Sequence, residues 1–364
     1  MRHWRAVSGG CVARACAPLA VAAVAAITTL APASFAQSGG ATGSLERFEP
    51  SVPGDAMFGV PSPAVGGHLV PRAALIFDYA YQPLSIQDGD TRYVIVSDQL
   101  FMHAAASFAL FDRLLLSADM PFALAQGGDN PVVADVPFAS PAGAQVGDLR
   151  LGARLRLFGD FWDPFQLGIG GYIHAPTADA GSYAGDGSVR GQPQLLLGGR
   201  FDHFVYSASL GTTLHASARP HTFDARAGAA LVLGESVFQI GPELSIAAPL
   251  GDDVVLETDQ AKITVASPVA AELLLGAKLR VLRSLVFGVG AGPGLTQGWG
   301  TPVFTGVGSI AYDPLPPRPR SDGDGDGIAD AEDACPKVAG VRNDDPRKNG
   351  CPLDSDGDGI ADAE

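Results

Sequence analysis

The chain has 364 residues, 46% of them hydrophobic, and carries 39 acidic against 24 basic residues, a formal net charge of −15. Charged residues make up only 17% of the chain, which excludes a disordered protein. The acidic balance argues against a nucleic-acid-binding protein, which would present a basic face. The 46 glycines are unusual for a helical enzyme, because glycine weakens helix interiors.

Residues 1–36 are typical of a secretory signal peptide. The first 14 residues contain three arginines, and Leu19–Leu30 is almost wholly apolar. Small residues then lie one and three positions before a cleavage site between Ala36 and Gln37. An uncleaved membrane anchor is the alternative. Residues 37–67 form an N-terminal segment to which we assign no regular element.

A two-residue period runs through residues 68–313, where no apolar run approaches the roughly 18–20 residues of a membrane helix. In Leu149–Leu157 every odd position is leucine or alanine, and the even positions are three arginines and a glycine. Successive side chains of a strand point to opposite faces, so this segment has one apolar and one basic face. In Leu285–Leu295 the even face is almost entirely glycine.

The period predicts about twelve strands. They lie near residues 68–81, 99–110, 114–124, 147–158, 165–174, 191–200, 204–214, 223–233, 237–248, 268–281, 285–295 and 303–313. Short and long connections alternate, as in outer-membrane barrels with short periplasmic turns and long external loops. We therefore expect an all-β fold, a transmembrane antiparallel β-barrel. The chain would enter its first strand and leave its last strand on the periplasmic side. Ten or fourteen strands would also fit, and a soluble sandwich or solenoid is the alternative fold.

Several charged residues fall on the face that would line the barrel lumen. They are Arg150, Arg154, Arg156, Asp224, Arg226, Glu243, Glu272, Lys278 and Arg280. Mixed signs are more typical of ionic networks that fill a narrow barrel than of a selective channel. The seven histidines form no compact motif with serine and aspartate, so we predict no catalytic residues and no enzyme.

The C-terminal part differs from the barrel region in composition. Four prolines within Asp313–Arg320 favour an extended spacer, so residues 314–321 are a predicted linker. Residues 321–364 then hold 13 acidic and 4 basic residues, which is most of the net negative charge. Cys335 and Cys351 are the two cysteines that remain after signal removal, and in an oxidising compartment they could form a disulfide bond.

An aspartate-rich cassette occurs twice in this tail, 32 residues apart. Its spacing matches that of calcium-binding loops, which place oxygen ligands at positions 1, 3, 5, 7 (a backbone carbonyl), 9 and 12. The predicted ligands are Asp322, Asp324, Asp326, Ile328, Asp330 and Asp333, then Asp354, Asp356, Asp358, Ile360 and Asp362. So many carboxylates would repel one another without a cation of calcium size. The alternative is a solvated acidic linker.

Residues 322–364 resemble thrombospondin type 3 repeats, in the aspartate cassettes and in the Cys-Pro elements at Cys335 and Cys351. The resemblance implies a Cys335–Cys351 disulfide, which with calcium would replace a hydrophobic core. A barrel followed by such repeats further resembles the OmpA family, in which the repeats lead to a peptidoglycan-binding domain. The second cassette stops at its eleventh position, so we expect the chain to be a fragment whose C-terminal domain is missing.

Together these observations favour a structural outer-membrane protein. The barrel would sit in the lipid, and a calcium-stiffened periplasmic spacer would tether the membrane to peptidoglycan in the intact protein. One alternative is a porin-type channel for small solutes. A second is a calcium-dependent cell-surface adhesion protein, which requires the tail to lie outside the cell.

Overall fold

The computed structural model describes most of the chain after the predicted signal peptide. The described residues are 44–45, 47–88, 91–133, 136–179, 182–216, 220–234, 236–251, 254–257, 262–265, 269–296, 300–318 and 322–353. The signal peptide and the second aspartate cassette lie outside them. No helix among the described residues is long and apolar enough to cross a membrane.

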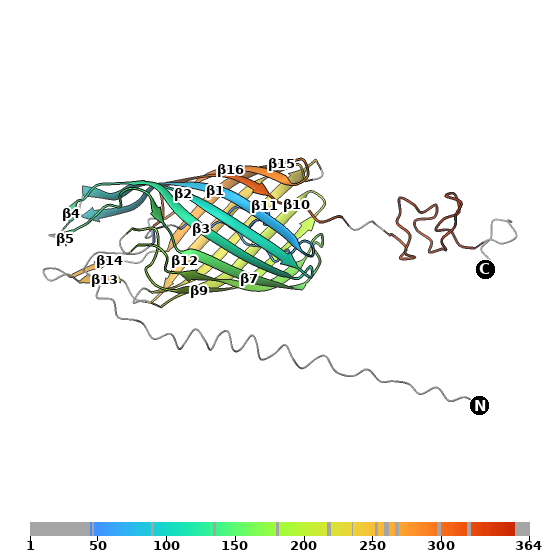
Figure 1. The fold of residues 1–364 in the computed structure, drawn as a ribbon, viewed down its shortest axis with the longest axis horizontal. Helices are drawn as coiled ribbons and strands as arrows, with labels where there is room; N and C mark the ends of the chain where they lie inside the picture. The colour runs from blue at the N-terminus through green and yellow to red at the C-terminus, as the bar shows by residue number, and fades with distance from the viewer. Residues whose placement is uncertain are drawn as a thin grey trace, which may run out of the picture. The chain divides into compact units, whose positions relative to one another are not determined.

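Twelve long strands form a closed antiparallel barrel (Figure 1). They are β1 (Val70–Asp88), β2 (Thr91–Leu110), β3 (Leu114–Gly127), β7 (Leu149–Phe158), β8 (Gln166–Ala175), β9 (Arg190–Phe201), β10 (Phe204–His215), β11 (His221–Leu233), β12 (Phe238–Leu250), β15 (Ala270–Val281), β16 (Leu285–Pro293) and β17 (Phe304–Tyr312). Each pairs with its sequence neighbour in this set, and β1 pairs with β17 to close the ring. The predicted fold class is confirmed.

The alternation of exposure along strands such as β7 confirms the two predicted faces. In β7, Leu151 and Leu155 are 48% and 41% exposed, whereas Arg154 is 5% exposed. The apolar face therefore points outward and the charged face inward, as in a barrel surrounded by lipid. Aromatic side chains cluster on the outer surface near the ends of several strands, as in the girdles of membrane barrels. They are Phe158, Phe165, Phe201, Phe204, Phe238 and Tyr312.

The connections divide the barrel into two ends. The short-turn end holds the tight connections between β2 and β3, β7 and β8, β9 and β10, β11 and β12, and β15 and β16. The start of β1 and the end of β17 lie at this end too. The other connections form the long-loop end, which carries the short strands β4 (Val132–Val133), β5 (Val136–Pro137), β6 (Gln145–Val146), β13 (Val254–Glu257) and β14 (Lys262–Val265).

One predicted loop is wrong. Residues 82–98, expected to connect two strands, continue β1 and β2 as a paired extension at the long-loop end. Leu84 and Val96 of this extension are buried in a small core with Leu45 and Tyr183. The extension is stable as strand because residues from distant parts of the chain cover its apolar face.

Candidate functional site

The barrel lumen is filled by residues 44–67, which we call the plug segment. Its described residues have no regular secondary structure, yet Met57, Val60 and Val65 are each 1% exposed. It begins at the long-loop end, where the N–H of Ser44 donates to Asp186 (2.9 Å). It ends at the short-turn end, where the carbonyl of Gly67 accepts from the N–H of Asp112 (3.2 Å). The plug segment therefore runs the length of the barrel.

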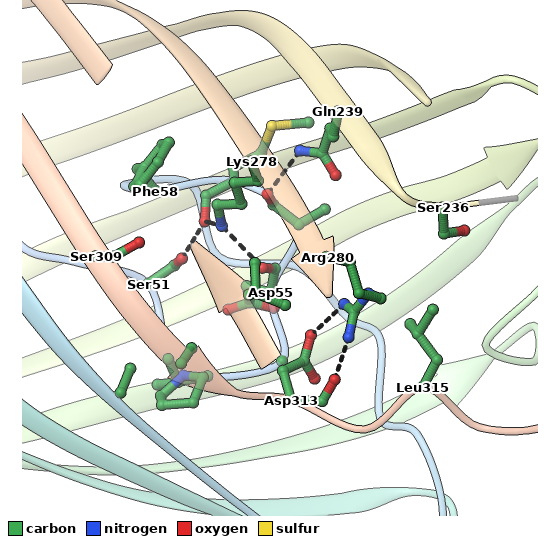
Figure 2. A pocket seen from close by; sticks show the side chains of 18 of the residues that line it. Ser51, Asp55, Phe58, Ser236, Gln239, Lys278, Arg280, Ser309, Asp313 and Leu315 are labelled. Carbon is green, nitrogen blue, oxygen red and sulfur yellow. Dashed lines mark hydrogen bonds and ion pairs between the residues drawn. The ribbon is translucent and has the colours of Figure 1, made fainter. Parts of the chain in front are cut away.

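Glu243 of β12 and Lys278 of β15 bond the middle of the plug segment through its main chain. Glu243 accepts from the N–H groups of Phe58 (2.6 Å) and Gly59 (2.7 Å). The Lys278 ammonium donates to the carbonyl of Met57 (3.0 Å) and to that of Asp55 (3.2 Å), and Figure 2 shows Lys278 beside Asp55. A segment without helix or strand leaves its buried backbone groups unpaired unless side chains serve them. Glu243 and Lys278 pair four of these backbone groups with partners in the wall.

Two arginines bond the same segment, Arg154 from β7 on the far side of the barrel and Arg226 from β11, the strand next to β12. Arg154 donates to both carboxylate oxygens of Asp55 (2.9 and 3.0 Å), and both side chains are buried. Arg226 pairs with Glu49 (2.7 Å) and also reaches the Gly59 carbonyl. Charge-assisted bonds of this kind are the stronger ones in proteins, so the plug segment is held firmly.

The glycine face predicted in β16 has a steric role. A Cβ on Gly288 would come within 2.7 Å of the Phe58 ring, and so would one on Gly276 of β15. The two glycines therefore leave the space that Phe58 occupies. The Lys278 ammonium lies 4.6 Å from the centroid of the same ring, a cation–π contact.

The wall also contains an ionic cluster that the sequence analysis does not predict. His103 of β2 lies between Asp78 and Asp119, at 3.1 Å from each, and Arg150 lies 2.9 Å from Asp119. All four are buried and join strands β1, β2, β3 and β7. The alternation of polar and apolar positions in these strands was the available signal.

The remaining predicted lumen residues bond to the wall or to the mouth of the barrel. Asp224 accepts from Thr213 (2.7 Å), and Glu272 accepts from Thr305 (3.2 Å). Arg156 pairs with Asp160 (2.9 Å) at the short-turn end. The expected network of mixed charges is thus present, but much of it serves the plug segment.

Asp313, directly after β17, ties together the short-turn mouth. It pairs with Arg72 of β1 (2.8 Å) and Arg280 of β15 (2.7 Å), and Figure 2 shows the contact with Arg280. Arg72 also donates to the carbonyls of Gly66 and Pro314, so it joins the plug segment to the start of the linker. Burial alone would raise the pKa of Asp313, but the Arg280 and Arg72 guanidiniums outweigh burial and lower it.

Little space remains beside the plug segment at this end. The cavity between residues 51–58 and the wall has a volume of about 70 Å³. That is room for a few water molecules. The plug segment therefore occupies most of the lumen beside residues 51–58.

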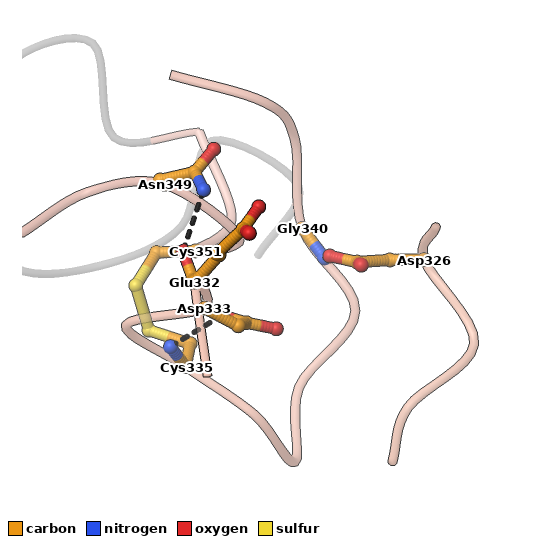
Figure 3. The surroundings of a disulfide bond; sticks show 7 residues. All are labelled: Asp326, Glu332, Asp333, Cys335, Gly340, Asn349 and Cys351. Carbon is orange, nitrogen blue, oxygen red and sulfur yellow. Dashed lines mark hydrogen bonds between the residues drawn. A yellow bond between two sulfur atoms is a disulfide. The ribbon is translucent and has the colours of Figure 1, made fainter. Parts of the chain in front are cut away.

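The tail contains the disulfide that the thrombospondin resemblance implied. Cys335 and Cys351 are bonded, with their Cα atoms 5.0 Å apart (Figure 3). The N–H of Gly340 donates to Asp326 (2.9 Å), which links the first cassette to the loop that the disulfide closes. Ile328 is 4% exposed and is the one buried hydrophobic side chain among residues 322–353.

The first cassette brings carboxylates together. One oxygen from each of Asp322, Asp324 and Asp326 lies within 4.8 Å of the others. Desolvation and the carboxylates around it, chiefly those of Asp326 and Asp333, raise the pKa of Asp324. The Oδ2 atoms of Asp324 and Asp333 are buried with no hydrogen-bond partner. This all-oxygen donor set suits a hard cation such as Ca²⁺. Asp330 bonds the N–H of Gly323 (2.7 Å).

No protein-family model matches the sequence, and none of the curated proteins searched matches it. An outer membrane channel from Pseudomonas putida F1 is similar over 69% of this chain and 97% of its own, at 14% identity and a TM-score of 0.49. A Pseudomonas aeruginosa FadL homologue is similar over 76% of this chain and 100% of its own, at 11% identity and a TM-score of 0.34. OmpF of Salmonella typhi, solved in complex with daunomycin, is similar over 67% of this chain and 97% of its own, at 8% identity and a TM-score of 0.29.

At these identities the similarity concerns the fold alone. The closed ring of strands and its outward apolar face, described above, define a membrane β-barrel by themselves, and no solute follows from the comparison. The resemblances to the OmpA family and to thrombospondin type 3 repeats stay proposals.

Proposed function

We propose that the protein is a porin-type outer-membrane channel for small solutes that its own N-terminal plug segment closes. The observation that carries this proposal is that charged side chains of the barrel wall form hydrogen bonds with the plug segment. Four such side chains form hydrogen bonds with residues 49–62 of the plug segment. They are Glu243, Lys278, Arg154 and Arg226. The tethering role that the sequence favoured has less support than this channel alternative.

The charged wall determines what the barrel becomes when the plug segment leaves. Buried charges without partners are costly, so Arg154, Glu243 and Lys278 would then need water. A lumen lined by hydrated charges is the water-filled interior typical of porins. The wall is therefore suited to two states, one closed by the plug segment and one filled with water.

The strength of the closed state sets the expected behaviour. Hydrogen bonds to charged groups contribute about 1.5–3 kcal/mol each, and several act together here. We therefore expect the closed state to dominate, with rare openings. Ion conductance of the full chain in planar lipid bilayers tests this. Brief openings above a closed baseline support it, and a permanently open pore contradicts the plug as a gate.

A second candidate function rests on the tail. We propose that the two cassettes bind calcium and stiffen the residues between the linker and Glu364. The convergence of Asp322, Asp324 and Asp326 and the buried Asp333 oxygen support the first site. Asp313 holds the start of the linker at the short-turn end, which in outer-membrane barrels faces the periplasm.

A periplasmic tail is consistent with tethering to peptidoglycan through a further domain, as the OmpA resemblance implies. A tail on the cell surface would instead suit calcium-dependent adhesion. Protease cleavage of residues 322–353 in intact cells separates the two. Cleavage only after the outer membrane is permeabilised supports the tether, and cleavage in intact cells supports adhesion.

A further inference from the structure

An open cavity of about 490 Å³ lies at the short-turn mouth. Its walls come from the β7–β8 turn, the end of β9, the β11–β12 turn and the linker. The lining includes Trp162, Arg200, Phe204 and Arg318. Arg200 also lines the smaller cavity beside the plug segment, so the two spaces share one wall residue.

Two guanidiniums in this cavity lie against one indole ring. The Arg318 guanidinium is 4.9 Å and that of Arg200 is 5.5 Å from the Trp162 ring centroid. Arg200 also lies 4.5 Å from the Phe161 ring. The indole N–H of Trp162 donates to the carbonyl of Pro317 (2.9 Å), which holds the linker beside the ring. The stacking therefore positions both cations at one place.

Arg200 differs from the other inward arginines at this end. Arg72 and Arg280 pair with Asp313, and Arg156 pairs with Asp160. No hydrogen bond or ion pair joins the Arg200 guanidinium to another side chain in the described part of the chain, where its contacts are aromatic rings.

Asp313 and Asp55 attract the Arg200 guanidinium electrostatically, but among the described residues no acid that lines the cavity forms an ion pair with Arg200 or Arg318. Asp163 and Asp202 line the cavity, but Asp163 accepts the N–H of Asp160 (2.7 Å), and neither forms an ion pair with Arg200 or Arg318 among the described residues. Stacked guanidiniums keep their N–H edges available, and those edges match the geometry of carboxylate and phosphate groups. Two adjacent cations also repel each other, and a bound anion relieves that repulsion.

We propose that Arg200 and Arg318, positioned by Trp162, form a binding site for the oxyanion group of a small solute, a carboxylate or a phosphate. The site stands at the mouth below the plug segment and needs no opening of the lumen. It deepens the proposed channel function by naming anionic solutes, and in that respect rests on it. The binding itself is independent of conduction.

Fluorescence of Trp162 in the detergent-solubilised full chain tests the site. Trp4 and Trp299 are replaced by Phe, which leaves Trp162 as the one tryptophan of the sequence. Inorganic phosphate and benzoate are titrated at constant ionic strength, with benzyl alcohol as the neutral probe. A saturable change with either anion and none with benzyl alcohol is expected. Phosphate alone would identify phosphate esters as the class, and benzoate alone would identify carboxylates.

Variants locate the site. Arg200→Gln should weaken anion binding about tenfold or more, and Arg200→Lys should weaken it less. Arg318→Gln should weaken binding several-fold, because Arg318 is more exposed. Arg113→Gln is the matched control, an exposed arginine at the same end outside the cavity, and should change nothing.

Equal affinity in wild type and Arg200→Gln, equal loss in Arg113→Gln, or equal binding of benzyl alcohol would overturn the proposal. Because the lumen stays closed in this assay, a failure to bind anions is distinct from a failure to conduct. Unchanged electrophoretic mobility of the unheated barrel shows that each variant is folded.

Discussion

The Glu243 carboxylate receives the main-chain N–H of Phe58 at 2.6 Å, so one wall residue of β12 fixes the backbone at the centre of the plug segment. Its second oxygen receives the next N–H, that of Gly59, at 2.7 Å. Glu243 is 5% exposed, which means that this bond has little competition from water. Loosening it should act on the gate and leave the barrel wall intact.

Glu243→Gln is the first test of that relationship. Glutamine keeps one acceptor oxygen but turns an NH₂ group toward the second N–H, and the charge is lost. We expect the plug segment to be weakened by about 1–3 kcal/mol, which raises the open probability about 5- to 150-fold in bilayer recordings. Asp129→Asn, an exposed loop change, is the control. An open probability equal to that of wild type would show that Glu243 does not hold the gate.

Gly276→Leu tests the steric fit of Phe58. The nearest Phe58 ring atom would lie 2.7 Å from a Cβ at position 276, so a larger side chain should expel the ring from its seat. We expect frequent openings in single-channel recordings and greater protease sensitivity of residues 47–67. Gly308→Ala is the matched control, since a Cβ there meets nothing within 4 Å. Identical behaviour of the two variants would contradict the proposed fit.

Asp313→Asn tests the short-turn mouth and its pH dependence. The pKa of Asp313 is lowered from 3.8, so its ion pairs contribute fully above about pH 3.8 and are lost as the pH falls through the lower folded-state value. We expect the variant to be less stable than wild type by about 1–3 kcal/mol in urea unfolding at pH 7.

The difference between Asp313→Asn and wild type should persist down to about pH 4 and then shrink. Asp202→Asn, an exposed turn residue at the same end, should match wild type throughout. A difference that grew on acidification would be inconsistent with the lowered pKa of Asp313.

Calcium binding to the tail should weaken as the pH falls. The pKa of Asp324 is raised, so protons compete with Ca²⁺ at a higher pH than at an ordinary aspartate of pKa 3.8. Calorimetric titration of the full chain should show tighter binding at pH 7 than at pH 5. Asp324→Asn should weaken binding at pH 7 and flatten the pH dependence, whereas exposed Asp344→Asn should do neither. A pH-independent affinity would refute the role of Asp324.

The strand pattern was readable because membrane barrels repeat it every two residues. Leu151 faces outward and Arg154 inward as the alternation requires, and the inward glycines and charges follow the same rule. What those inward groups contact was not readable. The plug segment has no period, because side chains of many strands satisfy its backbone. Contacts such as Arg154 with Asp55, 99 residues apart, depend on the closed ring and leave no local signal.

The extension of β1 and β2 was missed for the same reason, since Leu84 is covered by residues remote in sequence such as Leu45 and Tyr183. The tail behaved differently. Its cassettes and cysteines are close in sequence, so spacing alone brought Asp322, Asp324 and Asp326 into one predicted cluster.

The most direct measurement is the conductance of a chain from which residues 44–65 are deleted, with residues 1–43 and β1 retained. Planar bilayers containing this variant should show lasting open channels, and wild type should stay mostly closed under the same voltage and salt. Adding a synthetic peptide of residues 44–67 should reduce the current. A folded deletion variant that conducts no more than wild type would contradict the account of a charged lumen closed by its own N-terminal segment.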